Sequence, residues 1–350
     1  MRVRSRALIL AAAVGLAAGL ASACSSGSPA AGSSSSGAAT QSITIAGNAP
    51  TFTAAAYVAQ DLGYFAAHHV RVTILDNQGP NVPTLVVSGR ADIGIGAAAA
   101  EPVLLTSKGQ HVSVIYGEEG GGISASLVVR PGTTLASLKG MTNCTIGTYP
   151  QGTSAYGWAT IFSKDLGLKC RFSVYQSAPL QIAALTGGSV NAIIGSPANF
   201  SATVAAGKAA FLINCSLAAD RAKYVPSNPA WESVDFGIPS NLAAKRTAVE
   251  DFFLAYQEAK DWISKNGPAA TAKIVVKFPA ARAFTLAQLT STLTTNAPFT
   301  AIPDSTGQIT QAQWTTSLGF FANFGLPDYS AGNPQYAYAK VIDMSYLQGS

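Results

Sequence analysis

Gly89-Arg-Ala-Asp-Ile-Gly-Ile-Gly96 returns 99 positions later as Gly188-Ser-Val-Asn-Ala-Ile-Ile-Gly195. Both segments join a turn glycine, an Asp or Asn and a short apolar run, which is the pattern of a buried strand entered from a turn. A segment that recurs at a long, fixed spacing indicates two structural units of one kind. The sequence therefore predicts a chain built from two similar halves.

Three further pairs of segments recur in the same order. Thr44-Ile-Ala-Gly47 corresponds to Thr145-Ile-Gly-Thr148, Asp61-Leu-Gly63 to Asp165-Leu-Gly167, and Arg71-Val-Thr-Ile-Leu75, by residue type, to Arg171-Phe-Ser-Val-Tyr175. Each half alternates strands with amphipathic helices, and the strands are nearly continuous in apolar residues, as in sheets covered on both faces. We predict an α/β fold of two doubly wound lobes.

Two β-branched runs that end at a proline mark the joints between the lobes. They are Ser126–Arg130, before Pro131, and Ser233–Ile238, before Pro239. We expect them to be two crossover strands, so that lobe 1 is discontinuous (43–130 plus 235–350) and lobe 2 covers 131–234. An apolar stripe from 249 to 263 predicts a helix that stops at 266–268, and helices are expected within 284–317.

The first residues have the pattern of a secretory signal. Three arginines precede an uncharged apolar run that ends in small residues before Cys24, so residues 1–23 are expected to be a signal peptide. Ala21-Ser-Ala23 fits ordinary secretion, which leaves a free thiol, and also resembles a lipobox, in which Cys24 is lipidated. We favour the lipoprotein, because residues 24–42 are rich in Ser, Gly and Ala, typical of a flexible tether.

The charge and the cysteine content of the chain limit the functions that it can have. Without the three arginines of the signal, 19 basic residues face 17 acidic ones, so no nucleic-acid partner is indicated. Cys144 and Cys170 precede strands expected to be parallel neighbours, which makes them a disulfide candidate if their Cα atoms are close. Cys215 is expected to be a buried free thiol. The spacing of Cys and His fits no metal motif, and no cofactor is indicated.

The ordered segments together resemble a known family. Ala55–Phe65, Val72–Ile74, Ser88–Gly94, Leu135–Gly140 and Ile146–Gly147 with Gly152-Thr-Ser154 are similar to the SsuA/THI5-like periplasmic substrate-binding proteins. The resemblance implies the periplasmic binding protein type II fold, closure of two lobes over a small molecule, and delivery to an ABC transporter permease with its ATPase. With lipidation, the protein is expected at the outer face of the cytoplasmic membrane.

Ligands of open α/β sheets settle beyond the carboxyl ends of the strands, where helices begin. The loops at these ends give the predicted ligand-binding residues: Asn48, Thr53, Gln78, Ala97, Glu118 and Glu119 in lobe 1, and Gln151, Thr153, Ser154, Ser196 and Asn199 in lobe 2. The turn 151–154 is also explained by a plain helix N-cap, and the resemblance favours ligand contact. His68 and His69 are expected in a solvated turn away from the cleft.

The charges of the predicted loops indicate a ligand class. Asp76, Glu118 and Glu119 lie in cleft-facing loops, whereas the lysines and arginines that we considered map to helix ends or strand starts elsewhere. We therefore favour a ligand with an amine or a protonatable nitrogen heterocycle over a sulfonate or nitrate.

Two other function classes share this scaffold. An enzyme of the pyrimidine-synthesising THI5 branch resembles this chain in fold, but that branch uses an active-site histidine, and His68, His69 and His111 all fall outside the predicted cleft. No G-x-S-x-G nucleophile elbow is present either. A surface sensor is the second alternative, and co-purification with transporter subunits would distinguish it from an importer component.

Overall fold

The computed structural model describes residues 40–47, 49–76, 81–225, 230–300, 306–325 and 332–347. The signal peptide, Cys24 and nearly all of the expected tether lie outside these residues, as do Asn48 and Gln78 of the predicted site. The described chain begins its first strand at Gln41, slightly before the predicted start of the fold.

The first sheet has five strands in the order β2-β1-β3-β10-β4. Their bounds are β1 Gln41–Gly47, β2 Val70–Leu75, β3 Ile93–Ala98, β4 Ser113–Gly120 and β10 Trp231–Gly237. β1 pairs in parallel with β2 and β3, whereas β10 runs antiparallel between β3 and β4. The helices that follow its strands are α1 Ala54–Asp61, α2 Tyr64–Ala67, α3 Val82–Val87 and α4 Ala100–Ser107.

The second sheet repeats this plan in the order β7-β6-β8-β5-β9. Its strands are β5 Ser126–Val129, β6 Thr145–Thr148, β7 Arg171–Val174, β8 Ala192–Gly195 and β9 Ala210–Asn214, and its helices are α5 Leu135–Lys139, α6 Ser154–Asp165, α7 Ala178–Thr186, α8 Pro197–Ala205 and α9 Ala218–Tyr224. β6 is parallel to β7 and β8, and β5 is antiparallel to β8 and β9. The predicted fold class is confirmed.

The duplication extends to individual hydrogen bonds. In the first sheet the Thr44 N–H donates to Asp92 Oδ2 over 2.8 Å, and in the second the Thr145 N–H donates to Asn191 Oδ1 over 2.8 Å. Asp92 and Asn191 occupy the same place in the repeated segment that the sequence contains. Each side chain satisfies a strand N–H at the sheet end where the parallel ladder stops. The Asp or Asn of the repeated segment therefore has the same role in both sheets, which is to satisfy a strand N–H.

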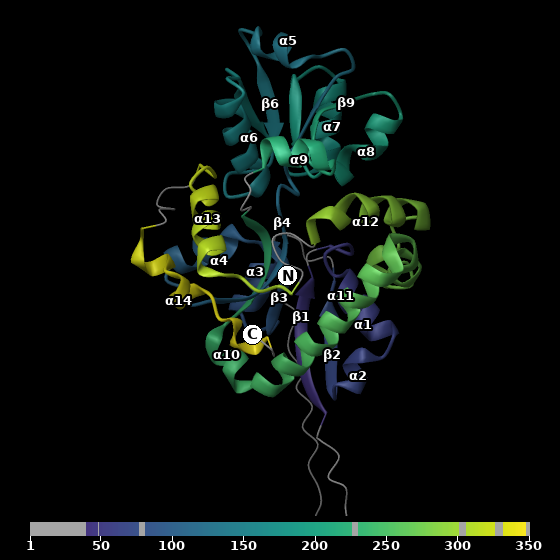
Figure 1. Ribbon diagram of the computed structural model, residues 1–350, viewed down its shortest axis with the longest axis vertical. Coiled ribbons are helices and arrows are strands. Elements are labelled where there is room, and N and C mark those ends of the chain that lie inside the picture. The colour runs from purple at the N-terminus through teal and green to yellow at the C-terminus, as the bar shows by residue number, and fades with distance from the viewer. Residues whose placement is uncertain are drawn as a thin grey trace, which may run out of the picture. The chain divides into compact units, whose positions relative to one another are not determined.

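Apolar residues fill both faces of each sheet, as the continuous strand patterns predict. Leu127 and Ile194 pack with α6 on one face of the second sheet, and Val128 and Ile193 pack with α7 and α8 on the other. Figure 1 shows this sheet in teal with α6 on one side and α7 and α8 on the other.

The strand assignments show where the chain passes between the sheets. β5 pairs within the second sheet and β10 within the first, so the chain changes sheets between residues 121 and 125 and again before Trp231. The predicted crossover strands exist, but each belongs to the sheet that it enters. The behaviour of the two sheets as separate lobes stays a prediction.

The last part of the chain is helical. Its elements are α10 Pro239–Ala244, α11 Arg246–Val275, α12 Leu286–Thr300, α13 Gln311–Phe321 and α14 Tyr338–Val341, with 3₁₀ turns at Pro279–Ala281, Pro334–Tyr336 and Met344–Tyr346. α11 breaks at Gly267, whose φ of 76° is left-handed, and Pro268 starts its second half. The predicted stop is thus a kink between two joined helices.

α13 contacts β10 of the first sheet and also α6, which packs on the second, although its place in the sequence predicts that it belongs to lobe 1. Ser317 Oγ accepts a 2.9 Å hydrogen bond from the N–H of Trp231 in β10, whereas the ring of Phe320 lies 5.0 Å from that of Trp158 in α6. Beyond α13, the carbonyl of Phe324 accepts a 3.1 Å bond from the N–H of Gly152. The C-terminal segment therefore joins β10 to the start of α6.

Candidate functional site

A cavity of about 330 Å³ lies where β4 ends against α11 and α12. Its volume is at the lower end of the range for small-molecule sites, roughly 300–1,000 Å³. The apolar part of its wall comprises Phe52, Ala54, Ala55, Ile263, Pro268 and Leu293, and its polar part includes Glu118, Glu119, Tyr256, Lys260, Asp261 and Asn296. A mostly apolar wall with a few convergent polar groups is typical of a ligand site.

The two glutamates of the cavity lie in a strand, which corrects their prediction as loop residues. Glu118 and Glu119 belong to β4, and their exposed fractions are 5% and 3%. β10 pairs with β4 as far as Gly120 through several register shifts, and this irregular pairing keeps the glycine-rich end of β4 in the sheet. Both carboxyl groups are therefore buried.

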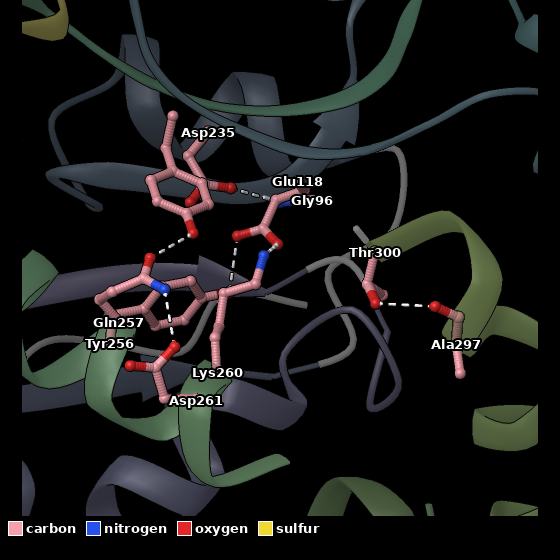
Figure 2. Close-up of polar contacts among 10 residues, drawn as sticks. Gly96, Glu118, Asp235, Tyr256, Gln257, Lys260, Asp261, Ala297 and Thr300 are labelled. Carbon is pink, nitrogen blue, oxygen red and sulfur yellow. Dashed lines mark hydrogen bonds and ion pairs between the residues drawn. The ribbon is translucent and has the colours of Figure 1, made fainter. Parts of the chain in front are cut away.

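Glu118 is held by a cation and a phenol from α11 (Figure 2). Its Oε2 lies 3.1 Å from Lys260 Nζ, and its Oε1 accepts a 2.6 Å hydrogen bond from the hydroxyl of Tyr256. The ammonium of Lys260 also lies 4.8 Å from the centre of the Tyr116 ring, a cation–π contact. Burial, the largest single influence, lowers the pKa of Lys260, but Glu118, Tyr116 and Asp235 together outweigh it and raise the pKa above the usual value.

Two further carboxyl groups surround this ion pair. Asp235 of β10 accepts a 2.9 Å bond from the N–H of Gly96, and burial followed by the nearby Glu118 charge raises the pKa of Asp235 well above its usual value. Burial, Glu118 and Glu232 raise the pKa of Glu119 likewise, while Lys260 opposes the rise. With only one cation facing these acids, the cluster favours protonation of Glu119 and Asp235.

The other predicted residues of the first sheet have structural contacts. Thr53 is buried, donates a 3.0 Å hydrogen bond from Oγ1 to the carbonyl of Ala49, and fills the space beside Gly47. Ala97 is buried within β3. The carboxylate of Asp76 accepts a hydrogen bond from the Tyr57 hydroxyl. None of these is among the described residues that line the cavity.

The predicted residues of the second sheet lie outside this cavity lining as well. Thr153 caps α6, because its Oγ1 accepts a 3.3 Å bond from the Tyr156 N–H and donates over 2.8 Å to the carbonyl of Pro150. Gln151 Nε2 donates to the Tyr156 hydroxyl over 3.3 Å. Ser154 is buried within the first turn of α6, Ser196 is the N-cap of α8, and Asn199 is exposed. Of the nine predicted residues that the structure describes, Glu118 and Glu119 line this cavity.

Sequence reasoning missed Lys260, Tyr256 and Asn296. A signal for Lys260 was present, since it follows Tyr256 by four residues and so shares a helix face with the apolar stripe of α11. A cation beside such a stripe indicates a buried partner. Asn296 carried no comparable signal, because α12 is rich in Thr, Asn and Gln throughout.

The cysteine and histidine predictions can be compared directly with the structure. Cys144 and Cys170 are bonded, with Cα atoms 4.3 Å apart, and Cys215 is a buried free thiol whose pKa burial raises to about 12. His68 lies in the turn before β2 and its Nε2 is 2.9 Å from Glu258. Among the described residues, no cluster of His, Cys, Asp or Glu could hold a metal ion, and no helix is long and apolar enough to cross a membrane.

Two sheets of identical order, each with an antiparallel fourth strand, define the fold of the periplasmic binding proteins. The sulphonate-binding protein SsuA from Escherichia coli shares it with a TM-score of 0.65 and 14% identity, over 87% of this chain and 91% of that one. A ligand-binding component of an ABC-type import system from Staphylococcus aureus, solved with zinc, gives 0.66 and 14%, over 88% and 98%. The nitrate-binding protein NrtA from Synechocystis gives 0.63 and 13%, over 88% and 87%.

No curated protein sequence matches this chain. Residues 51–270 match the NMT1/THI5-like family model, and the chain belongs to that family. The family resemblance seen in the sequence is confirmed.

Proposed function

We propose that this protein is the extracytoplasmic solute-binding component of an ABC importer, which holds a small organic molecule and delivers it to a permease with its ATPase. The observation that carries the proposal is the cavity at the end of β4, where an apolar wall encloses a buried, specifically paired Lys260–Glu118 group. Proteins of the same fold include import-system components and sulphonate- and nitrate-binding proteins, which supports the same role here.

The location follows from the sequence. A signal peptide over residues 1–23, a lipidated Cys24 and a flexible tether would keep the folded part at the outer face of the cytoplasmic membrane. There it can meet the solute and the permease without crossing the bilayer.

A binding role also accounts better for the site than the enzyme alternative does. None of the three histidines, all of which are described, lines the cavity. The acid and base pair of the cavity wall, Glu118 and Lys260, is internally neutralised and held by Tyr256. A pair that is already neutralised and hydrogen-bonded within the protein is poorly placed to exchange protons with a substrate.

Native mass spectrometry of the purified full chain tests the proposal. We expect one small molecule per chain, released on unfolding. Ala297 is exposed on α12 and lines the cavity, so Ala297→Trp should fill the cavity and abolish retention. Ala287→Trp, at an exposed position of the same helix outside the lining, is the matched control. A chain that retains nothing and binds no compound of a transport-substrate panel would contradict the proposal.

A further inference from the structure

Two buried oxygen atoms in the cavity wall accept no hydrogen bond from any residue that the structure describes. They are Oε2 of Glu119, on β4, and Oδ1 of Asn296, on α12. The exposed fractions of these residues are 3% and 6%. A buried polar atom without a partner costs about 1–3 kcal/mol, so a hydrogen-bond donor bound at this wall would stabilise both oxygens.

Both atoms are carbonyl-type oxygens, which accept hydrogen bonds. The cation nearest to them is unavailable to a ligand, because the Lys260 ammonium is bound to Glu118 and packed over Tyr116. The remaining charged group on the wall is Asp261, another carboxylate, at the exposed side of α11. Apart from the paired Lys260, the charged groups of the cavity wall are thus carboxyl groups.

The rest of the wall selects for an apolar body. The side chains of Ala54, Ala55, Ile263 and Leu293 in the lining are hydrocarbon, and the cavity volume of about 330 Å³ suits a compact molecule. A ligand that satisfies the whole surface therefore carries a hydrogen-bond donor head on a small apolar group.

We infer that the cavity binds a small organic cation, an amine or amidine on a compact apolar body, with Glu119 and Asn296 accepting its N–H groups. The inference rests on the proposed binding function and specifies its ligand class. Glu119 becomes the counter-ion and Asn296 orients the head group. This agrees with the ligand class favoured by the sequence, but it assigns recognition to a carboxyl and an amide on different elements.

The binding step has a defined proton balance. Glu118, Glu232 and Lys260 are the charged groups that act on Glu119, and the two acids together with burial outweigh the lysine. The carboxyl of the empty site is therefore protonated at pH values where an exposed glutamate is ionised. Binding a cation favours the carboxylate, so binding releases a proton and affinity rises with pH through the raised pKa.

One wall feature favours the opposite ligand charge. The first turn of α1 reaches the cavity at Ala54 and Ala55, and helix N-termini attract anions. Anionic compounds are therefore the decisive comparison.

The experiment uses four compounds that share one ring: benzylamine, benzamidine, benzyl alcohol and benzenesulfonate. Thermal shift and calorimetry on the full chain should show stabilisation by benzylamine and benzamidine beyond that of the other two. Glu119→Gln, which resembles the protonated carboxyl in shape, should fold normally and weaken amine binding by about 10- to 100-fold. Asn296→Ala should weaken it by about 5- to 10-fold. The control Glu258→Gln removes an exposed carboxylate from the same helix, α11, outside the cavity lining and should change affinity less than 3-fold.

Two results would overturn the inference: amine binding no stronger than binding of the neutral or anionic compound, or amine binding unaffected by Glu119→Gln. Calorimetry in buffers of different ionisation enthalpy gives an independent readout, since proton release is expected in the wild type and not in Glu119→Gln. If native mass spectrometry finds a bound anion, the ligand class is wrong and the binding function stands. If no compound of any class binds, the binding function itself fails.

Discussion

Removing the cation of the buried ion pair should destabilise the fold far more than removing the pair. The side chains of Lys260 and Glu118 are 13% and 7% exposed, and Nζ and Oε2 are 3.1 Å apart. Breaking a buried pair from one side costs about 3–5 kcal/mol, because an uncompensated charge remains. Glu118 keeps the hydrogen bond from Tyr256, so we expect Lys260→Met to cost about 3 kcal/mol, at the lower end of that range.

The double variant Lys260→Met with Glu118→Gln provides the control. Both charges are then absent, the methionine retains the apolar stem, and the glutamine amide oxygen can still accept from the Tyr256 hydroxyl. We expect most of the lost stability to return, since replacing both partners of a buried pair is close to neutral.

Thermal unfolding at neutral pH measures both variants. At about 2–4 °C per kcal/mol for a protein of this size, Lys260→Met should lower Tm by roughly 6–12 °C, and the double variant by only a few degrees. If the single variant costs less than about 1 kcal/mol, or the double variant is no more stable than the single one, Glu118 is not a buried charge that depends on Lys260.

Three other outcomes follow from the sequence and the structure. Cys24→Ala should move the protein from the membrane fraction to the soluble one, and continued fractionation with membranes would rule out the lipid anchor. Replacing both cysteines of the disulfide with serine should cost about 3.5 kcal/mol in urea unfolding, since the bond closes a loop with a sequence separation of 26, and alkylation of either cysteine without reduction would show that no bond forms. Gly157→Ala in α6 should destabilise the fold, because the new Cβ would clash with the Phe324 ring. Gly319→Ala in α13 adds a Cβ that meets nothing within 4 Å and should stabilise the fold by up to ~1 kcal/mol. Equal effects of the two substitutions would contradict the contact with Phe324.

The architecture was predictable because it depends on local patterns. In each sheet, the repeated segment (Gly89–Gly96 or Gly188–Gly195) contains a strand and, directly before it, the Asp or Asn side chain that accepts a hydrogen bond from the neighbouring strand. The strand and this side chain lie close together in sequence. The same holds for Cys144 and Cys170, which directly precede β6 and β7, two parallel neighbours.

The site was less predictable because its geometry depends on distant pairing. The segment Gly117-Glu-Glu-Gly-Gly-Gly122 has the composition of a loop, and it forms the end of a strand only because β10 pairs with it from more than 100 residues away. Without that pairing, the sequence gives no reason to place Lys260 of α11 against Glu118. At Thr153 the difficulty is different, because a capping hydroxyl and a ligand-binding hydroxyl have the same sequence pattern.

In the sequence, the second sheet is inserted between β4 and β10 of the first, and this constrains how the chain can fold. β4 pairs with no strand of its own sheet except β10, which is synthesised only after the whole second sheet, and β5 enters the second sheet before any of that sheet's parallel strands exist. The five strands of the second sheet lie in one continuous stretch, residues 126–214, whereas the first sheet needs β10 from beyond that stretch to complete its ladder. A nascent or truncated chain that ends before Trp231 exposes an edge of β3 and leaves β4, with its two glutamates, without its strand partner. The first sheet, and with it the cavity wall at the end of β4, is therefore complete only once chain from beyond the second sheet is in place.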